Sequence, residues 1–137
     1  MYDEDRTEEF LRKYRNIAVV GISENPERPS YDVASYLLKQ GFNIIPINPA
    51  LQSWKGIKAY KDLRSIPRDV KVEIIDIFRK PDQILPIVED ALAIHPEVIW
   101  MQEGLMNEEA AQLAKKNHIK VVMDRCMKKE HIRHAQR

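Results

Sequence analysis

The sequence has a single cysteine, Cys126, among its 137 residues. One cysteine excludes an intramolecular disulfide and a zinc site built from several cysteines. Basic and acidic residues nearly balance, at 22 and 21, so the chain lacks the basic excess that is typical of nucleic-acid-binding proteins. Its apolar runs are only a few residues long, far short of the ~18 that a membrane span needs. We therefore expect neither nucleic acid nor a membrane among its partners.

The beginning and the length of the chain set further bounds. Residues 1–5 are acidic, whereas a secretory signal begins basic and continues apolar, so we expect a cytoplasmic protein. A chain of this length forms one domain and can bury roughly 68% of the surface that its unfolded form exposes. We expect a single domain over residues 1–137, with a short amphipathic helix at 3–14 and a charged C-terminal tail at 128–137.

Between these ends, short apolar runs of the strand type alternate with amphipathic helical patterns. The predicted strands are residues 17–22, 43–47, 72–78, 98–101 and 120–123, with a brief one at 56–60. The predicted helices between them are residues 30–41, 81–92 and 107–116. Such alternation requires parallel strands joined by right-handed crossovers, and a closed eight-fold barrel would need about 250 residues. The sequence therefore predicts an α/β fold with a doubly wound, mostly parallel open sheet of about five or six strands.

In a sheet of this kind, ligands bind outside the carboxyl ends of the strands. The first loop at that edge lacks the dinucleotide motif Gly-x-Gly-x-x-Gly, because Ser23 stands at the place of its second glycine. Asn48 ends the second strand, where an acidic residue would hold the ribose hydroxyls of NAD. No Gly-Lys-Ser/Thr sequence occurs anywhere in the chain. These features exclude an NAD site and a Walker-type phosphate loop.

A phosphate-compatible turn remains after the first strand. Gly21 ends this strand and leads toward a helix N-terminus, which attracts phosphate. The loop supplies the Ser23 hydroxyl, the Asn25 amide and the Arg28 guanidinium, whose fork matches phosphate oxygens. Residues 79–80, Arg and Lys, add positive charge at the same edge. Taken singly, Gly21 is more typical of a packing glycine and Arg28 of a solvated surface charge, but together with the polar residues at the same edge they favour an anionic ligand.

Several segments occur in a characteristic order along the chain. They are residues 17–23, 25–31, 47–49 with Gly56, 76–81, 100–104, 107–111 and 121–126. In this order they resemble the stand-alone coenzyme A-binding domains, which are similar to the CoA-binding domain of the succinyl-CoA synthetase alpha subunit. The resemblance extends over residues 17–131. The chain departs from the family pattern at residues 95–97 and at Lys55.

This resemblance implies a Rossmann-like fold that binds CoA across the strand ends. It implies phosphate contacts from the first loop, adenosine contacts from Asn48 and Pro49, a channel wall from Phe78 and Arg79, and pantetheine contacts from residues 102–104. The full set of implied CoA-binding residues is Gly21, Ile22, Ser23, Asn25, Arg28, Ser30, Tyr31, Asn48, Pro49, Phe78, Arg79, Lys80, Gln102, Glu103 and Gly104. The synthetase region that carries a phosphorylated histidine has no counterpart, so the resemblance implies binding without synthetase chemistry.

The residues show no catalytic constellation. The carboxylates, Asp62, Asp69, Glu73 and Asp76 among them, form no pair suited to acid–base chemistry. His131 and His134 share a helix face at a spacing of three and could approach Cys126, but a closed zinc site needs a fourth ligand. We therefore expect no metal. Cys126 is either a half-buried structural residue or a thiol activated by the neighbouring Arg125 for exchange with a thiol ligand.

The expected function is that of a module that binds coenzyme A or an acyl-CoA and carries no catalytic residues. Two alternatives stay open. One is a CoA-dependent enzyme or thiol-exchange protein that uses Cys126. The other is a CoA-binding subunit of a larger acyl-CoA synthetase. A homodimer or an unidentified protein partner also stays open, because no apolar stripe on the predicted helices marks an interface.

Overall fold

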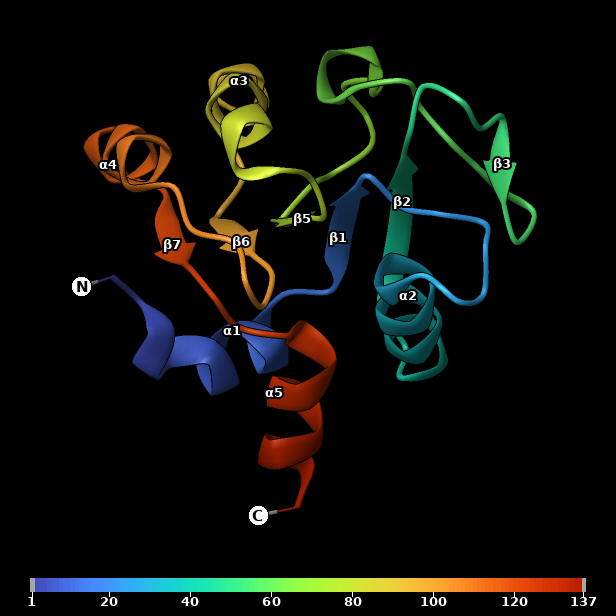
Figure 1. Cartoon of the computed structure of the whole chain (residues 1–137), viewed down its shortest axis with the longest axis horizontal. Coiled ribbons are helices and arrows are strands. Elements are labelled where there is room, and N and C mark those ends of the chain that lie inside the picture. The colour runs from blue at the N-terminus through green and yellow to red at the C-terminus, as the bar shows by residue number, and fades with distance from the viewer. Residues whose placement is uncertain (1, 137) are drawn as a thin grey trace.

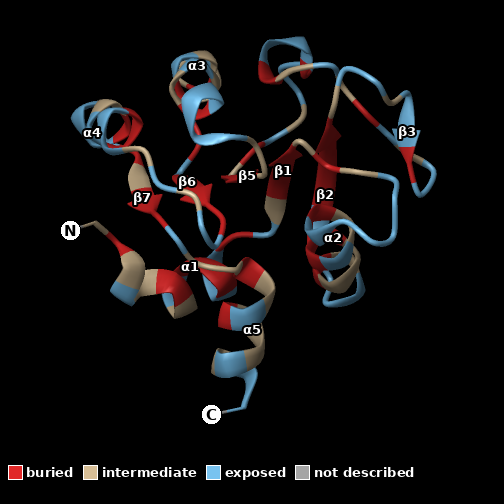
Figure 2. Ribbon diagram, viewed as in Figure 1, coloured by how far each residue is buried: buried red, intermediate tan, exposed pale blue. Residues whose placement is uncertain are grey.

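Five parallel strands form the central sheet, in the order β2-β1-β5-β6-β7. They are β1 (Asn16–Val20), β2 (Asn43–Ile47), β5 (Ile74–Ile77), β6 (Val98–Met101) and β7 (Lys120–Val122). The computed structural model describes residues 2–136. Four of the five strands are buried over nearly their whole length, as expected for a parallel sheet with both faces covered (Figure 2). The predicted doubly wound α/β sheet is confirmed.

Helices cover both faces of this sheet (Figure 1). One face packs against α1 (Thr7–Lys13), α2 (Pro29–Lys39) and α5 (Met127–Ala135), and the other against α3 (Pro81–Ala91), α4 (Glu108–Lys116) and the 3₁₀ turn η2 (Leu63–Ser65). A short 3₁₀ turn, η1 (Glu4–Arg6), precedes α1, and a small hairpin of β3 (Ser53–Trp54) and β4 (Ile57–Lys58) lies beside the sheet. Residues alternate between the two faces along each strand, so Ile75 and Ile77 join one core and Ile74 joins the other.

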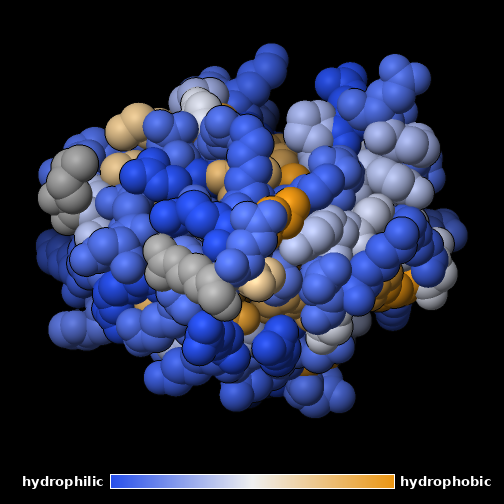
Figure 3. Space-filling view, turned by 90° about the horizontal axis from the view of Figure 1, so that it is seen from below, coloured by the Kyte–Doolittle hydropathy of each residue, from blue (hydrophilic) through white to orange (hydrophobic). Residues whose placement is uncertain are grey.

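The C-terminal segment forms a helix, α5, where the sequence predicted a charged tail. Met127, the first residue of α5, is fully buried. The buried carboxylate of Glu130 accepts a hydrogen bond of 2.6 Å from the hydroxyl of Thr7 on α1. The ring of His131 packs edge-on against Tyr36 and Phe42. The prediction failed because polar and aromatic partners, rather than a stripe of aliphatic residues, hold this helix. Seen from below, the face over α1 and α5 is mostly hydrophilic (Figure 3).

The N-terminal segment covers the edge strand β7. The backbone N–H of Asp3 donates to Val121 O at 2.8 Å, and the Asp3 carboxylate accepts from Val121 N at 2.9 Å. The Glu4 carboxylate accepts from Met123 N at 3.0 Å. These bonds satisfy edge groups that would otherwise be open to pairing with another chain. Among the described helices, none combines the length and hydrophobicity needed to cross a bilayer.

Candidate binding cleft at the switch point of the sheet

The order of the strands reverses between β1 and β5. From β1 the chain crosses through α2 to β2 on one side, and from β5 it crosses through α3 to β6 on the other. Two neighbouring strands whose connections diverge leave a crevice at their carboxyl ends, and ligands of open α/β sheets bind there. Gly21 and Phe78 follow these two strands directly and stand at this point.

Gly21 brings the two strand ends unusually close. Its φ of +87° lies in the region that favours glycine, and its N–H donates to Ile47 O at 2.9 Å. A Cβ atom placed on Gly21 would lie 2.2 Å from the carbonyl oxygen of Phe78. Any other residue would therefore collide with the backbone that follows β5. Close packing accounts for this glycine, as one of the two interpretations of the sequence proposed.

A cleft of about 950 Å³, here called the switch-point cleft, opens outside these strand ends. Most of the predicted CoA-binding residues line it, from three of the four segments that the sequence singled out; Asn48 and Pro49 do not. The predicted residues in its wall are Gly21, Ser23, Arg28, Ser30, Phe78, Arg79, Lys80, Gln102 and Glu103. The wall also contains Pro29, Val33, Pro81, Gln83, Leu105 and Cys126, none of which the prediction assigned to CoA binding.

The cleft carries unpaired positive charge. Arg28, Arg79 and Lys80 line it, and none of the three makes an ion pair with any residue in the described range 2–136. The acidic residue in the wall, Glu103, forms an ion pair with Lys129 at 2.8 Å. An anion entering the cleft would therefore meet cations that no protein carboxylate neutralises. Guanidinium and ammonium groups in such a state favour phosphate ligands.

Three helices begin at this cleft. The wall contains Arg28 and Pro29 at the start of α2, Lys80 and Pro81 at the start of α3, and Cys126 just before α5. Proline suits the first helical position because the N–H it lacks would have no partner within the helix. The N-terminal ends of helices carry partial positive charge, which adds to the field of the basic side chains. The topology thus concentrates positive potential where the sheet reverses.

The first loop is held in shape by its own polar groups. Ser23 N donates to the Ser30 hydroxyl at 3.0 Å, and the Ser23 hydroxyl accepts from Asn25 N at 3.0 Å. The indole N–H of Trp54 donates to the carbonyl oxygen of Ser23 at 2.9 Å. The Ser23 hydroxyl keeps its own proton available as a donor. The loop is therefore ordered by the protein itself, with the Ser23 hydroxyl at the wall of the cleft.

The other predicted residues lie outside the wall of the cleft. Ile22 is fully buried in the core, and Asn48 bridges the two loops, donating to Ile22 O and accepting from Ala50 N, both at 2.8 Å. The ring of Tyr31 packs edge-on against Trp54, with 5.7 Å between centroids. Asn25, Pro49 and Gly104 are likewise absent from the wall. The structure thus gives Ile22, Asn48 and Tyr31 a packing role, and ligand contacts from this group stay predictions.

A buried carboxyl group lies beneath one wall of the cleft. Asp76, in the middle of the sheet, is fully buried, and its Oδ1 accepts a 2.6 Å hydrogen bond from the Gln102 side-chain amide. Burial raises the pKa of Asp76 to about 8, so this group is largely protonated and uncharged at neutral pH. From the sequence alone, Asp76 is one of several carboxylates with no partner suited to acid–base chemistry. The available signal was an acidic residue inside an otherwise apolar strand.

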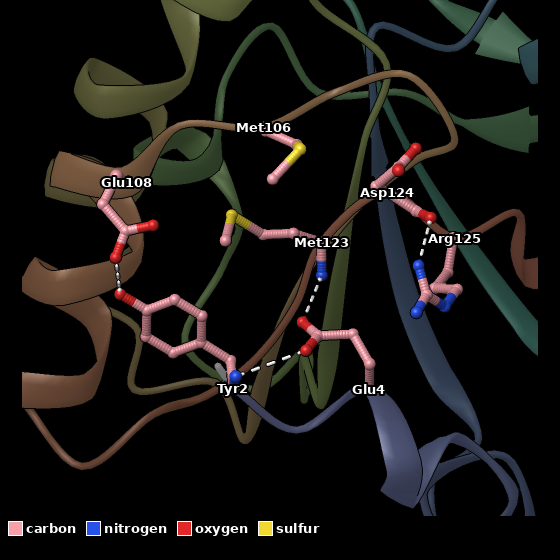
Figure 4. Close-up of a pocket in the computed structure, with 7 residues that line it drawn as sticks. All are labelled: Tyr2, Glu4, Met106, Glu108, Met123, Asp124 and Arg125. Atoms are coloured by element: carbon pink, nitrogen blue, oxygen red, sulfur yellow. Dashed lines mark hydrogen bonds between the residues drawn. The ribbon is translucent and has the colours of Figure 1, made fainter.

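A second, smaller cavity of about 350 Å³, here called the N-terminal pocket, lies between the N-terminal segment and the loops around α4 and β7 (Figure 4). Its wall is formed by Tyr2, Glu4, Met106, Glu108, Met123, Asp124 and Arg125. None of the predicted CoA-binding residues belongs to it. The Tyr2 hydroxyl donates to the Glu108 carboxylate, a bond that raises the pKa of Tyr2 to about 12. The polar groups of the N-terminal pocket therefore largely bind one another.

Within residues 2–136, no cluster of three or more His, Cys, Asp or Glu side chains could hold a metal ion. His131 instead hydrogen-bonds the Tyr36 hydroxyl through Nδ1 at 2.7 Å. His134 lies 2.9 Å from the Thr7 hydroxyl. Both histidines thus contribute to the packing of α5 against α1 and α2.

A family model described as the CoA binding domain matches residues 15–132, which includes every strand of the sheet and the whole switch-point cleft. The chain belongs to this CoA-binding domain family. The resemblance seen in the sequence is confirmed. The matched segment accounts for most of the 137 residues of the chain.

Individual relatives agree with this assignment. An uncharacterized protein of Bacillus subtilis, YneT, is 38% identical over 123 residues, covering 90% of each chain. The alpha subunit of an ADP-forming acetate–CoA ligase II from Pyrococcus furiosus is 37% identical over 67 residues, which are 48% of this chain and 15% of that subunit. A hypothetical protein from Pyrococcus horikoshii has a solved structure with a TM-score of 0.91 and 37% identity, covering 98% of this chain and 93% of that one.

Proposed function

We propose that this protein binds coenzyme A or an acyl-CoA in the switch-point cleft and acts as a binding module without chemistry of its own. The observation that carries this proposal is the group formed by Arg28, Arg79 and Lys80, three cleft cations with no acidic partner among the described residues. CoA is a polyanion with a diphosphate and a 3′-phosphate. Membership of the CoA-binding domain family supports the choice of CoA among phosphate-containing ligands.

The proposed arrangement follows the chemistry of the wall. The phosphates lie at the turn that contains Gly21 and Ser23, within reach of Arg28 and of the N-terminal end of α2. Arg79 and Lys80 bind phosphate oxygens from the opposite strand end. The pantetheine arm runs toward Gln102, and the thiol end lies on the side of Cys126. The adenosine lies toward Asn48 and Pro49, as the family resemblance implies.

Calorimetric titration of the reduced protein with CoA, dephospho-CoA, ADP and NAD tests the proposal. We expect CoA to bind with micromolar affinity and NAD not to bind. Replacing Arg28 with Ala should weaken CoA binding about 10-fold, because a hydrogen bond to a charged group contributes about 1.5 kcal/mol or more. Arg68→Ala removes an arginine outside the cleft and serves as the matched control. Binding of NAD but not CoA, or binding of neither, would contradict the proposal.

A second candidate function rests on Cys126, which is half-buried and lines the same cleft. In this case the Cys126 thiolate attacks a disulfide that contains CoA, forming a protein–CoA disulfide and releasing the other thiol. Mass spectrometry after incubation with CoA disulfide should then show an adduct of one CoA. Under this candidate, Cys126→Ser should abolish the adduct. If the protein is only a binding module, Cys126→Ser should leave its CoA affinity within a few-fold of the wild type.

The match to a CoA ligase alpha subunit favours a third candidate, in which the protein serves as the CoA-binding part of a larger synthetase. This candidate requires a second polypeptide. Size-exclusion chromatography and mass spectrometry of the native protein distinguish the cases. A stable complex with another chain supports the synthetase candidate, and a monodisperse monomer or homo-oligomer supports the independent binding module.

A further inference from the structure

The hydrogen bond between the buried residues Asp76 and Gln102 runs from the middle of the sheet toward the wall of the switch-point cleft. A contact that served only to fill the core would not need this arrangement. Strand alternation places Asp76, Trp100 and Gln102 on the same face, since Asp76 is paired with Trp100 in register and Gln102 lies two residues beyond it. Gln102 is 4% exposed, and that remaining surface lies in the wall of the switch-point cleft. The pair therefore connects the middle of the sheet with the cleft.

The hydrogen bond determines how the Gln102 amide is turned. Its Nε2 donates to Asp76 Oδ1 at 2.6 Å, and within residues 2–136 no donor bonds its Oε1. Oε1 is also absent from the fully enclosed side-chain atoms that lack a partner. Because the amide is planar, its oxygen points away from Asp76, which accepts the hydrogen bond from its nitrogen. Oε1 is thus the amide atom left without a protein partner, on a residue that lines the cleft.

Asp76 is poorly explained as a stabilising residue. Its Oδ2 is fully enclosed without any hydrogen-bond partner among the described residues, and Asp76 itself is surrounded by the apolar strands β1 and β6. Burying an unsatisfied polar group destabilises a fold, so a valine of similar size would suit this strand better. Because burial keeps Asp76 protonated at neutral pH, the group adds no negative charge beside a cleft that favours anions.

We propose that Asp76 is a positioning residue: it holds Gln102 so that Oε1 faces the cleft and accepts a hydrogen bond from an amide N–H of the ligand. In the proposed function this amide belongs to the pantetheine arm of CoA, so the inference rests on that function. The arm carries amide N–H groups, whereas the nucleotide end of CoA carries the phosphates. The acceptor therefore distinguishes CoA from a nucleotide that lacks the arm.

The test compares CoA with adenosine 3′,5′-bisphosphate, which has phosphates but no pantetheine arm. The wild type should bind both ligands. Asp76→Val removes the acceptor for Nε2 and should weaken CoA binding about 2- to 10-fold, the usual range for one neutral hydrogen bond, without changing bisphosphate binding. Asp76→Asn keeps a carbonyl acceptor and should stay within two-fold of the wild type for both ligands.

Two further measurements separate positioning from a general structural role. The double variant Asp76→Val/Gln102→Ala should bind CoA no more weakly than Gln102→Ala, because Asp76 acts only through Gln102. In urea unfolding, Asp76→Val should be at least as stable as the wild type although it binds CoA less tightly. Ile74→Val, a change on the same face of β5 that lies outside the wall of the cleft, is the matched control and should alter neither affinity.

Equal weakening of both ligands, or unchanged CoA binding by Asp76→Val, would overturn the inference. Asp76→Ser, whose hydroxyl is too short to meet Gln102 Nε2, gives the same comparison if the valine variant does not fold. Absence of binding of either ligand to the wild type contradicts the proposed function instead, so the two failures are distinguishable.

Discussion

The switch-point cleft and the N-terminal pocket differ in how their polar groups are paired. In the N-terminal pocket, Tyr2 is bonded to Glu108, and Glu4 accepts from the backbone N–H of Met123 (Figure 4). In the switch-point cleft, Arg28 and Arg79 have no acidic partner within residues 2–136. Groups that satisfy one another stabilise the fold, whereas groups left without partners retain their interactions for a ligand. The larger cleft is therefore the binding site we propose, and the pocket fastens the N-terminal segment.

The strongest test of the cleft's architecture is Gly21→Ala. The new Cβ would collide with the Phe78 carbonyl oxygen at 2.2 Å and would also occupy a positive-φ position, so the free energy of unfolding should fall by about 3 kcal/mol or more. Gly41→Ala is the matched control, because Gly41 also has positive φ but nothing lies within 4 Å of its added Cβ. Urea unfolding measures both. Equal losses would show that the close approach is unimportant.

A second test compares charge in the two cavities. The double variant Arg28→Ala/Arg79→Ala should weaken CoA binding on the order of 100-fold, since each charged hydrogen bond contributes about 1.5 kcal/mol or more. Arg125→Ala removes an arginine from the N-terminal pocket and should stay within two-fold. Calorimetry at two salt concentrations measures the effect, and the wild type should show the steeper salt dependence. A large loss of CoA affinity in Arg125→Ala would instead indicate that CoA binds in the N-terminal pocket.

A third test concerns the pH dependence of stability. The pKa of Asp76 is about 8 in the folded protein and near its ordinary 3.8 when unfolded. Between these values the folded state keeps a proton that the unfolded state releases, so rising pH lowers the free energy of unfolding. Asp76→Asn removes this dependence and should gain on the order of 5 kcal/mol over the wild type at pH 8 relative to pH 4, because each pH unit between the two pKa values changes the free energy of unfolding by about 1.4 kcal/mol. Parallel pH profiles of the two proteins would contradict the burial argument.

The smallest expected effect lies in the N-terminal pocket. Tyr2→Phe removes the hydrogen bond to Glu108 and should lower the free energy of unfolding by about 0.5 kcal/mol, with CoA affinity unchanged. Thermal unfolding and calorimetry measure the two quantities. Glu108→Gln, which keeps an acceptor for the Tyr2 hydroxyl, should lose less. Weaker CoA binding in Tyr2→Phe would mean that the pocket and the cleft are coupled.

Much of the fold could be predicted from the sequence, because the local periodicity of apolar residues differs between strands and helices. The apolar run at residues 17–22 and the proline-rich segment after it predict a strand that ends at Gly21. The helix α5 could not be predicted in this way. Its buried surface depends on Thr7, Tyr36 and Phe42, which are remote in the chain and meet Glu130 and His131 only after folding.

The candidate site was predictable to a similar extent. The rule that ligands bind at the carboxyl ends of parallel strands directs attention to Arg28, Phe78, Arg79 and Gln102, and all four line the cleft. The same rule does not distinguish a loop residue that faces the ligand from one that supports the loop. Asn48 and Ile22 belong to the second kind, because their partners are backbone and core atoms that the sequence does not identify.

The sequence by itself determined the order of elements, the parallel sheet, the edge at which we propose binding, and membership of the CoA-binding domain family, because these depend on spacing along the chain. Only the tertiary structure decided which polar groups are paired. It brought Gly21 against Phe78, turned Gln102 toward Asp76 and left the cations of the cleft without partners. Pairing depends on distances of a few ångströms between residues far apart in the chain, and those distances exist only once the layers have packed.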